Sequence, residues 1–439
     1  MISQLKLLSE RFLKSTENKK VNVITHHDTD GISSAAILIK TLQKLDRKFS
    51  IRIIKQLEKE MIDELIKEDE VNIFLDLGSS NIEELEKVKG EVFIIDHHQI
   101  DKEKVGNTNI INPMLTGDPD ISGSSLTYLF AKEINKENTN LAKLAIIGMI
   151  GDMLEKNINH FTNQIIKDAK EVIVKKGLSF FSATRPLHKA LEFSNIYING
   201  VTGKENGAIK FLNEIGIEWK TNGSYRTPLD LDEDENSKLI TSLLLRVSND
   251  NGDNERLISN LYLIKFLNKM EDARELSTLI NACSRLGHSE VALALCLETK
   301  RAKEKAETIY AEYKQNLVHA LNTIENIDKI EGKNYVIINA RDEIKDTIIG
   351  TVASMLSNSP KYTPETIIIT MAYSEDKVKV SGRIKYGRNI AEILSRVIAE
   401  LGGECGGHPN AAGCLISKNQ EYDFIEKLKK ELEIEVVKL

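Results

Sequence analysis

Two histidines and two aspartates are crowded into five residues directly after an apolar run near the start of the chain. In the stretch "VNVITHHDTDGISSAAIL" (21–38) they are His26, His27, Asp28 and Asp30. Two carboxylates this close repel each other unless a cation lies between them. Taken alone, the stretch is also compatible with an ordinary turn. An EF-hand is excluded, because its glycine and glutamate spacing is absent and a strand-like run precedes the turn.

Further acids and histidines follow later apolar stretches: Asp76, Asp96, His97, His98 and Asp152. Buried unpaired carboxylates are costly, and metal ions are the usual way to neutralise them. Oxygen and nitrogen donors without thiolates suit Mn²⁺, Mg²⁺, Co²⁺ or Zn²⁺. Because these donors exceed the need of one ion, we predict two metals about 3.5–4 Å apart, bridged by one aspartate, as in enzymes that catalyse displacement at phosphorus. Singly, the DHH stretch could be a strand-end cap, and Asp152 a helix cap or a core salt-bridge partner.

The apolar runs alternate with helical patterns in the first third of the chain. The predicted strands are 21–25, 50–54, 71–76, 91–96 and 108–112, and the predicted helices are 31–46, 58–68 and 81–89. Continuous apolar runs separated by helices are typical of a doubly wound parallel sheet covered on both faces. Sites in such sheets form beyond the carboxyl ends of the strands, where these acids and histidines stand.

Four segments are expected along the chain. They are an α/β domain at 1–160, a mainly helical region at 161–299, a long connector helix at 300–330 and a smaller C-terminal α/β domain at 331–439. The patterns also predict helices at 122–134, with serines suited to cap its start, and at 140–156. The acidic stretch at 227–238 is expected to form a loop. C-terminal strands are expected at 334–340, 365–373 and 377–384, and helices near 346–357 and 389–401.

Composition is that of a soluble globular chain of 439 residues, with 28% charged residues and a net charge of −7. A net negative charge does not attract nucleic acid to the protein as a whole, so a nucleic acid would bind through a local groove or through metals. The four cysteines show no zinc spacing and are expected to be reduced thiols. With no signal-peptide pattern and no run near ~18 apolar residues, we expect a cytoplasmic protein that does not engage a membrane.

The motifs together resemble a known family. In order and spacing, "HHDTDG", "FLDLGSS", "IIDHH" and the GD of "MIGDM" are similar to the four motifs of the DHH phosphoesterase superfamily. "KVSGR" and "GGECGGHPNAAG" resemble the C-terminal DHHA1 domain, and 273–298 resembles the archaeal RecJ-like branch of single-strand exonucleases. That branch includes proteins that associate with the replicative helicase factor GINS or with the Hef repair helicase/nuclease.

The resemblance implies roles for individual residues. The first metal would be held by His26, Asp28 and Asp76, and the second by Asp30, Asp76, His97 and Asp152. Asp76 would bridge the two ions. Asp96 would orient the histidine as an outer partner, and His98 would face the substrate phosphate as hydrogen-bond donor or general acid. At His26, bacterial RecJ proteins often have an aspartate.

The C-terminal motifs imply a substrate-binding surface. A glycine-rich loop permits close approach to an anion, and an arginine can clamp a phosphate with two hydrogen bonds. Alone, the loop could be a turn and Arg383 a surface ion pair. With the resemblance, the residues expected to bind substrate opposite the metals are Ser381, Arg383, Gly406, Gly407, His408 and Asn410. Arg383 and His408 would take part in turnover beside His98. Cys405 stands where relatives often have glycine.

The predicted activity is therefore that of a two-metal phosphodiesterase, with Mn²⁺ the expected ion. The expected substrate is single-stranded DNA or RNA, cut from an end in replication or repair. One alternative is a nanoRNase or small-nucleotide phosphatase, although those relatives are usually shorter. Another is a replication or repair scaffold of the Cdc45 type with residual metal binding. The helical middle region could dock a partner or space the two α/β domains.

Overall fold

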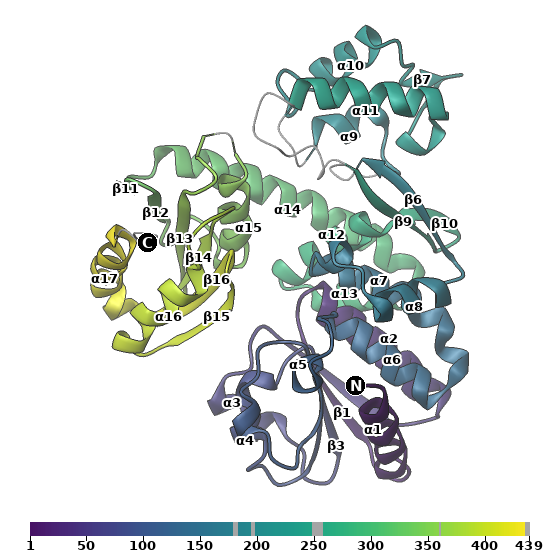
Figure 1. Cartoon of the computed structure of the whole chain (residues 1–439), viewed down its shortest axis with the longest axis vertical. Helices are drawn as coiled ribbons and strands as arrows, with labels where there is room; N and C mark the ends of the chain where they lie inside the picture. Colours follow the sequence, from purple (N-terminus) through teal and green to yellow (C-terminus); the bar gives the residue numbers. More distant parts are fainter. Residues whose placement is uncertain (179–182, 195–197, 248–257, 360, 435–439) are drawn as a thin grey trace. The chain divides into compact units, whose positions relative to one another are not determined.

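The computed structural model describes residues 1–178, 183–194, 198–247, 258–359 and 361–434. The chain forms two compact units, Met1–Tyr310 and Ala311–Leu439. The boundary between them falls within the long helix α14 (Lys300–Asn326), so a helix is present where one was predicted (Figure 1). The division into the four predicted segments stays a prediction.

A five-stranded parallel sheet forms the centre of the first unit, in the order β2-β1-β3-β4-β5. The strands are β1 (Val21–His26), β2 (Phe49–Ile54), β3 (Val71–Leu75), β4 (Glu91–Ile95) and β5 (Asn109–Ile111). Every pairing among them is parallel. The predicted α/β class and all five predicted strands are confirmed. The strand order changes direction at β1 and β3, which makes the carboxyl ends of these strands the expected place for a site.

Helices cover both faces of this sheet. One face packs against four helices, α1 (Ile2–Ser15), α2 (Thr29–Lys44), α6 (Gly123–Ile134) and α7 (Ala142–Gly151). The short helices α3 (Lys59–Leu65) and α4 (Ile82–Leu85) pack on the other. In the larger core the ring of Phe12 meets Phe93 and Phe130 edge-on, with centroids 5.3 and 5.4 Å apart. Ser122 caps α6 as predicted, its side chain accepting from the amide of Ser125.

The middle of the chain contains a sheet that the sequence patterns did not predict. Strands β6 (Val172–Leu178), β9 (Ile258–Phe266) and β10 (Lys269–Asp272) form an antiparallel sheet. Helices still prevail there: α8 (His160–Asp168), α9 (Leu187–Glu192), α10 (Glu205–Glu214), α11 (Glu233–Val247), α12 (Ala273–Arg285) and α13 (Ser289–Cys296). A two-stranded hairpin, β7 (Lys220–Thr221) with β8 (Ser224–Tyr225), precedes α11.

The predicted acidic loop at 227–238 is wrong from Glu233 onward, where α11 begins. Glu233, Asp234 and Glu235 lie in its first turn. Negative charge there interacts favourably with the positive end of the helix dipole, so an acidic run can start a helix as well as form a loop.

The second unit is built on a six-stranded mixed sheet, in the order β11-β12-β13-β14-β16-β15. Its strands are β11 (Lys329–Gly332), β12 (Tyr335–Asn339), β13 (Ile367–Ser374), β14 (Lys377–Arg383), β15 (Glu404–His408) and β16 (Ala411–Ser417). The helices are α15 (Asp346–Ser357), α16 (Ile390–Leu401) and α17 (Glu421–Glu433). The expected strands and helices of this α/β domain are confirmed.

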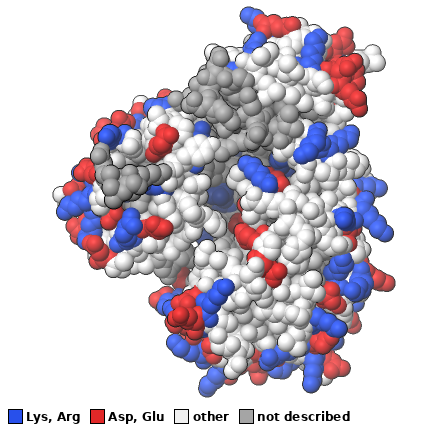
Figure 2. Space-filling model, viewed as in Figure 1, with Lys and Arg blue, Asp and Glu red and all other residues white. Residues whose placement is uncertain are grey.

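Acidic and basic side chains are interspersed over the visible face of the protein (Figure 2). This mixture agrees with the modest net charge of −7. Among the helices of the described ranges, none has the length and apolar character needed to cross a bilayer.

Candidate metal centre

The first cluster lies at the turn from β1 into α2. His26 ends the strand, and Asp28 is the N-cap of the helix, its Oδ1 accepting from the amide of Gly31 at 3.0 Å. Asp30 follows in the first helical turn and is fully buried. A Cβ at Gly31 would lie 2.3 Å from the carbonyl oxygen of His26, so the glycine lets the turn close.

Asp76 directly follows β3 and points into the same region. Its backbone is left-handed, with φ of 59°, and its amide donates to the carbonyl of Ile95 at 2.8 Å. Such a conformation is uncommon outside glycine and is tolerated best by Asn and Asp. The Asp76 side chain therefore does not follow the regular alternation of side chains along β3. It lies where the strand order of the sheet changes direction.

The six predicted ligands form two groups that share Asp76. In the first, Nδ1 of His26 lies 3.1 Å from Oδ2 of Asp28 and 3.5 Å from Oδ2 of Asp76. In the second, Nε2 of His97 lies 3.1 Å from Oδ2 of Asp152, 3.4 Å from Oδ1 of Asp76 and 3.9 Å from Oδ2 of Asp30. One Asp76 oxygen thus faces each group, and the donor atoms within each group lie within 4.8 Å of one another.

Asp152 reaches this centre from the end of α7. It is the C-cap residue of that helix, and its amide donates to the carbonyl of Gly148 at 3.1 Å. The sequence placed it inside an apolar helical stretch, and the helix ends one residue before it. Packing of α7 against α2 brings the Asp152 carboxylate to His97.

The polar atoms of the centre fit divalent cations. Several of them are buried and lack a hydrogen bond of good geometry: His26 Nδ1, Asp30 Oδ2, both oxygens of Asp76 and His97 Nε2. Burial raises the pKa of Asp30, and the nearby charges of Asp152 and Asp76 raise it further. Oxygen and imidazole donors in this arrangement suit ions such as Mn²⁺ or Mg²⁺, which would neutralise the excess negative charge.

Two glycines allow helices α6 and α7 to approach the carboxylates. A Cβ at Gly123 would lie 2.9 Å from Oδ1 of Asp76, and one at Gly148 would lie 2.4 Å from Oδ1 of Asp30. The same Asp30 oxygen accepts from the amide of Ser124 at 3.0 Å, in the first turn of α6. Backbone donors at a helix N-terminus stabilise the carboxylate there.

The two histidines of the DHH stretch have different acidic partners. Oδ1 of Asp96 lies 2.7 Å from Nδ1 of His98 and accepts from the amide of His97 at 2.8 Å. Oδ1 of Asp120 lies 3.2 Å from Nδ1 of His97. The expectation that Asp96 orients the metal-binding histidine is therefore corrected: its ring contact is to His98. Burial lowers the pKa of His98, but the hydrogen bond and charge of Asp96 outweigh this and raise it to about 9.

Sequence reasoning missed Asp120 and a further contact to the first cluster. Oδ1 of Asn281 in α12 accepts from the amide of Thr29 at 3.2 Å, and Oγ1 of Thr29 donates to the carbonyl of Ser277 at 3.0 Å. Thr29 stands between Asp28 and Asp30, so α12 helps to hold the turn that presents two predicted ligands. The only sequence signals were an acid in the turn before α6 and the family resemblance of 273–298.

Comparison with known proteins agrees with this architecture. Residues 20–149 match the model of the DHH family N-terminal domain, 180–261 that of the DHH-CID domain and 332–433 that of the DHHA1 domain. The chain is 31% identical to an uncharacterized protein of Methanocaldococcus jannaschii over 98% of both chains. It belongs to the DHH family. The resemblance drawn from the motifs is confirmed at this level.

Solved structures share the fold of this DHH protein at low sequence identity. RecJ from Thermus thermophilus, in complex with Mn²⁺, is 17% identical with a TM-score of 0.63, covering 98% of this chain and 55% of RecJ. CDC45 from Entamoeba histolytica is 14% identical with a TM-score of 0.68, covering 99% of both chains. The DHH protein thus spans about half the length of that RecJ.

In the DHHA1 domain, strand register aligns most of the predicted substrate-binding residues on one face. Arg383 pairs with Ala411, which pairs with His408, and Ser381 pairs with Gly413, which pairs with Gly406. Paired residues share a face of the sheet, and alternate residues share it too. His408 and Gly406 are exposed.

The other predicted residues of this domain are held differently. Nε of Arg383 donates to Oγ of Ser354 at 2.9 Å, which fixes the guanidinium against α15. Gly407 belongs to the opposite face, where a Cβ would lie 2.5 Å from the carbonyl oxygen of Ala411. Asn410 is exposed in the turn between β15 and β16, and its carbonyl accepts from the amide of Ile384 at 3.1 Å. Substrate contact by all six predicted residues stays a prediction.

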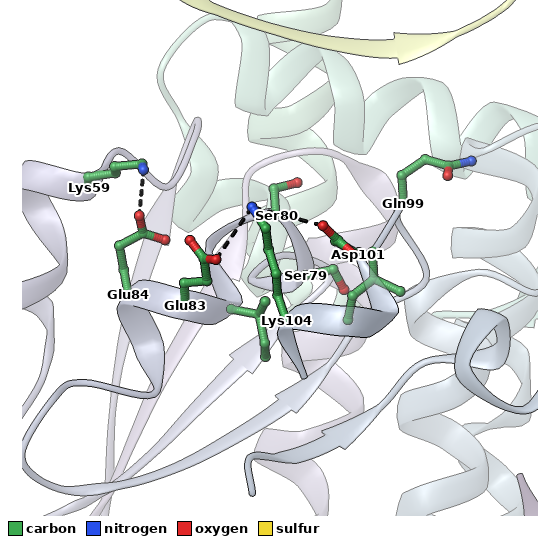
Figure 3. Close-up of a pocket in the computed structure, with 10 residues that line it drawn as sticks. Lys59, Ser79, Ser80, Glu83, Glu84, Gln99, Asp101 and Lys104 are labelled. Atoms are coloured by element: carbon green, nitrogen blue, oxygen red, sulfur yellow. Dashed lines mark ion pairs between the residues drawn. The ribbon is translucent and has the colours of Figure 1, made fainter. Parts of the chain in front are cut away.

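A polar pocket of about 430 Å³ lies beside the DHH stretch, lined by Lys59 of α3 and by residues that follow β3 and β4 (Figure 3). Gln99, directly after His98, is one of them. The two lysines that line the pocket form ion pairs with acidic residues: Lys59 lies 2.5 Å from Glu84, and Lys104 lies 3.4 Å from Glu83. Asp101 adds another carboxylate to the lining. Acids outnumber lysines here, so the pocket does not suit a phosphate.

Proposed function

We propose that this DHH protein is a metal-dependent phosphodiesterase that removes nucleotides from an end of single-stranded nucleic acid. The observation that carries the proposal is the position of Asp76, whose two oxygens face two different groups of donors. A carboxylate shared by two groups of donors would suit the two-metal arrangement used for displacement at phosphorus. None of the six predicted ligands has been replaced by a side chain unable to bind a metal.

The residues of the chain would have different roles in catalysis. The Asp and His donors would hold the ions, which supply Lewis-acid chemistry when bound. His98 is half-exposed, and because its Nδ1 faces Asp96, its Nε2 is the nitrogen left to meet a phosphate oxygen. In the DHHA1 domain, Arg383 and His408 would bind phosphate oxygens of the strand. Catalysis would then rest on positioning and on charge stabilisation.

The expected ion and substrate come from the family and from its structural neighbours. RecJ has been solved with Mn²⁺ and with Mg²⁺, and an exonuclease RecJ bound to manganese has the same fold with a TM-score of 0.60. We therefore propose Mn²⁺ with Mg²⁺ as the alternative, and single-stranded DNA or RNA as substrate. A role in replication or repair, and association with GINS or the Hef helicase/nuclease, belong to the same proposal.

A scaffold role of the Cdc45 type is the second candidate. It is favoured by the similarity to CDC45 along nearly the whole of both chains, with a TM-score of 0.68. Enzyme and scaffold make different predictions for metal-dependent hydrolysis, so activity separates them.

The test is digestion of 5′-labelled and 3′-labelled single-stranded DNA and RNA, and of dinucleotides, with Mn²⁺ or with EDTA. We expect stepwise shortening of strands with Mn²⁺ by the wild type and by Asp118→Asn, a control outside the ligand groups, and none by Asp76→Ala. Metal-dependent activity in Asp76→Ala would overturn the bridging role. Cleavage of dinucleotides alone would indicate a small-substrate enzyme. Metal binding without hydrolysis of any substrate would favour the scaffold.

A further inference from the structure

The four cysteines fall into two pairs with different surroundings. Cys283 and Cys296 are fully buried in the core of the first unit. Burial raises the pKa of each of these thiols to about 12. Such thiols stay protonated and are poor nucleophiles. They provide an internal reference for the second pair.

Cys405 and Cys414 face each other across neighbouring strands of the DHHA1 sheet. They are direct register partners of the antiparallel pair β15–β16. Directly opposed residues in such a pair have Cα atoms about 4.5–5.5 Å apart. Disulfides need Cα atoms about 4.4–6.8 Å apart, so the backbone already has the spacing of a cross-strand disulfide.

The two thiols also lie on one face of the sheet and differ in exposure. Oγ of Ser395 in α16 lies 3.7 Å from the sulfur of Cys405 as a hydrogen-bond donor, which places the pair on the α16 side. Cys414 is buried and Cys405 is half-buried. A small oxidant can therefore reach Cys405 first, with Cys414 directly behind it.

The contact between the thiols makes Cys405 the stronger nucleophile. The hydrogen bond from Cys414 lowers the pKa of Cys405 to about 7, although burial opposes this, and Ser395 adds to the lowering. The same contact and burial raise the pKa of Cys414. A thiolate that is accessible and lies beside a second thiol has the arrangement of an oxidation-sensitive pair.

We propose that Cys405 and Cys414 are a modification site at which a peroxide forms a cross-strand disulfide. The sulfur of Cys405 attacks one oxygen of hydrogen peroxide, the O–O bond breaks, and Cys405 becomes a sulfenic acid as one water leaves. The sulfur of Cys414 then attacks the Cys405 sulfur, the S–O bond breaks and a second water leaves. Overall the two thiols give up two electrons and two protons, and the peroxide is reduced to two waters.

The disulfide would act on the strand that bears predicted substrate-binding residues. Cys405 precedes Gly406 and His408 in β15, which lies at the edge of the sheet beside β16. Along the strands, the paired residues Cys405 and Cys414 are adjacent to the paired residues Gly406, Gly413 and Ser381. A covalent link would hold β15 on β16 at this point. The inference itself does not depend on phosphodiesterase activity.

The test uses the full-length protein in its native state. We expect hydrogen peroxide, followed by alkylation and peptide mass mapping, to yield one disulfide, between Cys405 and Cys414. Cys283 and Cys296 should stay reduced and become alkylated only after unfolding. Without peroxide, alkylation of Cys405 should increase as the pH rises through about 7.

Variants separate the two steps. Cys414→Ser should stop at a sulfenic acid on Cys405 that reacts with dimedone, Cys405→Ser should form no disulfide, and Cys283→Ser should behave as wild type. Three results would overturn the proposal: a disulfide that forms only between chains, oxidation of Cys283 before Cys405, or no Cys405–Cys414 disulfide in a wild-type protein that remains folded.

Discussion

Oδ1 of Asp120 lies 3.2 Å from Nδ1 of His97, while Nε2 of the same ring faces Asp152 and Asp76. A carboxylate that accepts from Nδ1 keeps the proton on that nitrogen and leaves the lone pair of Nε2 for a metal. Asp96 cannot do this, because its Oδ1 contacts the His98 ring and its Oδ2 accepts from the amide of Ser79 at 2.9 Å. Asp120 would thus act on the proposed metal centre through His97.

Asp120→Asn should weaken metal binding. Loss of a carboxylate behind a metal-binding histidine typically lowers affinity about 10-fold or more. Titration calorimetry with Mn²⁺ measures this directly, and hydrolysis should recover at high Mn²⁺. Asp118→Asn removes one charge from the same loop, where Asp118 pairs with the N-terminal amine rather than with the centre. Equal affinity in both variants would contradict the role of Asp120.

Asp30→Asn should change stability in opposite directions with and without metal. Burial and the charges of Asp152 and Asp76 raise the pKa of Asp30, so its charged form opposes folding when no cation is present. That penalty grows as the pH rises through the folded-state pKa. Asn removes the charge and can still accept from the amide of Ser124. In EDTA the variant should melt higher than wild type at neutral pH, and the added stabilisation by Mn²⁺ should shrink. A lower melting temperature in EDTA would contradict this account.

Gly148→Ala should displace Asp30. The new Cβ would lie 2.4 Å from Oδ1 of Asp30 and 2.1 Å from Oγ of Ser124, so the carboxylate or the helix must move. Overpacking of this kind costs about 1–3 kcal/mol. Chemical denaturation and Mn²⁺ titration should both report the loss. Ser124→Ala is the control, because Asp30 is held by the backbone amide of Ser124 and not by its hydroxyl. Comparable metal affinity in Gly148→Ala and wild type would rule out the displacement.

Asp168 should support stability that is lost in acid. Oδ2 of Asp168 accepts from the hydroxyl of Tyr128 at 2.7 Å and from Lys132, which ties α8 to α6. Burial raises the pKa of Asp168, but the hydrogen bonds from Lys132 and Tyr128 outweigh it and lower that pKa. The contribution is therefore present above the unfolded-state pKa of about 3.9 and is lost as the pH falls through the lower folded-state value.

The corresponding variant is Asp168→Asn, which should lose about 2 kcal/mol of unfolding free energy at pH 7. The difference from wild type should shrink below pH 4, as measured by urea denaturation across pH. Asp63→Asn, at an exposed position on α3, should change stability by less than about 0.5 kcal/mol. A gap between Asp168→Asn and wild type that is constant with pH would contradict the charge-based explanation.

The parallel sheet and its strand ends could be read from the chain because both depend on local patterns. Residues 73–75 and 92–95 form uninterrupted apolar runs, and strands buried on both faces need that composition. Once the strands are parallel, their carboxyl ends meet at one edge. His26, Asp76 and His97 were therefore predicted to converge before any contact was known.

Sequence patterns failed to predict the secondary structure where one local pattern is compatible with two structures. The acids at Glu233–Glu235 suit a solvated loop and the first turn of a helix equally well, and only packing of α11 into its own small core decided between them. Strand β6 contains two adjacent lysines, which hide its alternation, and its pairing with β9 joins segments far apart in the chain.

The sequence by itself determined the donor types, their order and the strands that present them, because side-chain chemistry and hydrophobic periodicity are local properties. Tertiary structure decided which nitrogen and oxygen atoms meet: Asp120 with His97 across 23 residues, and Asn281 with Thr29 across 252. It also decided that the carboxylate of Asp96 contacts the ring of His98. These contacts depend on how helices pack around the sheet, and packing over such separations leaves no periodic signal in the chain.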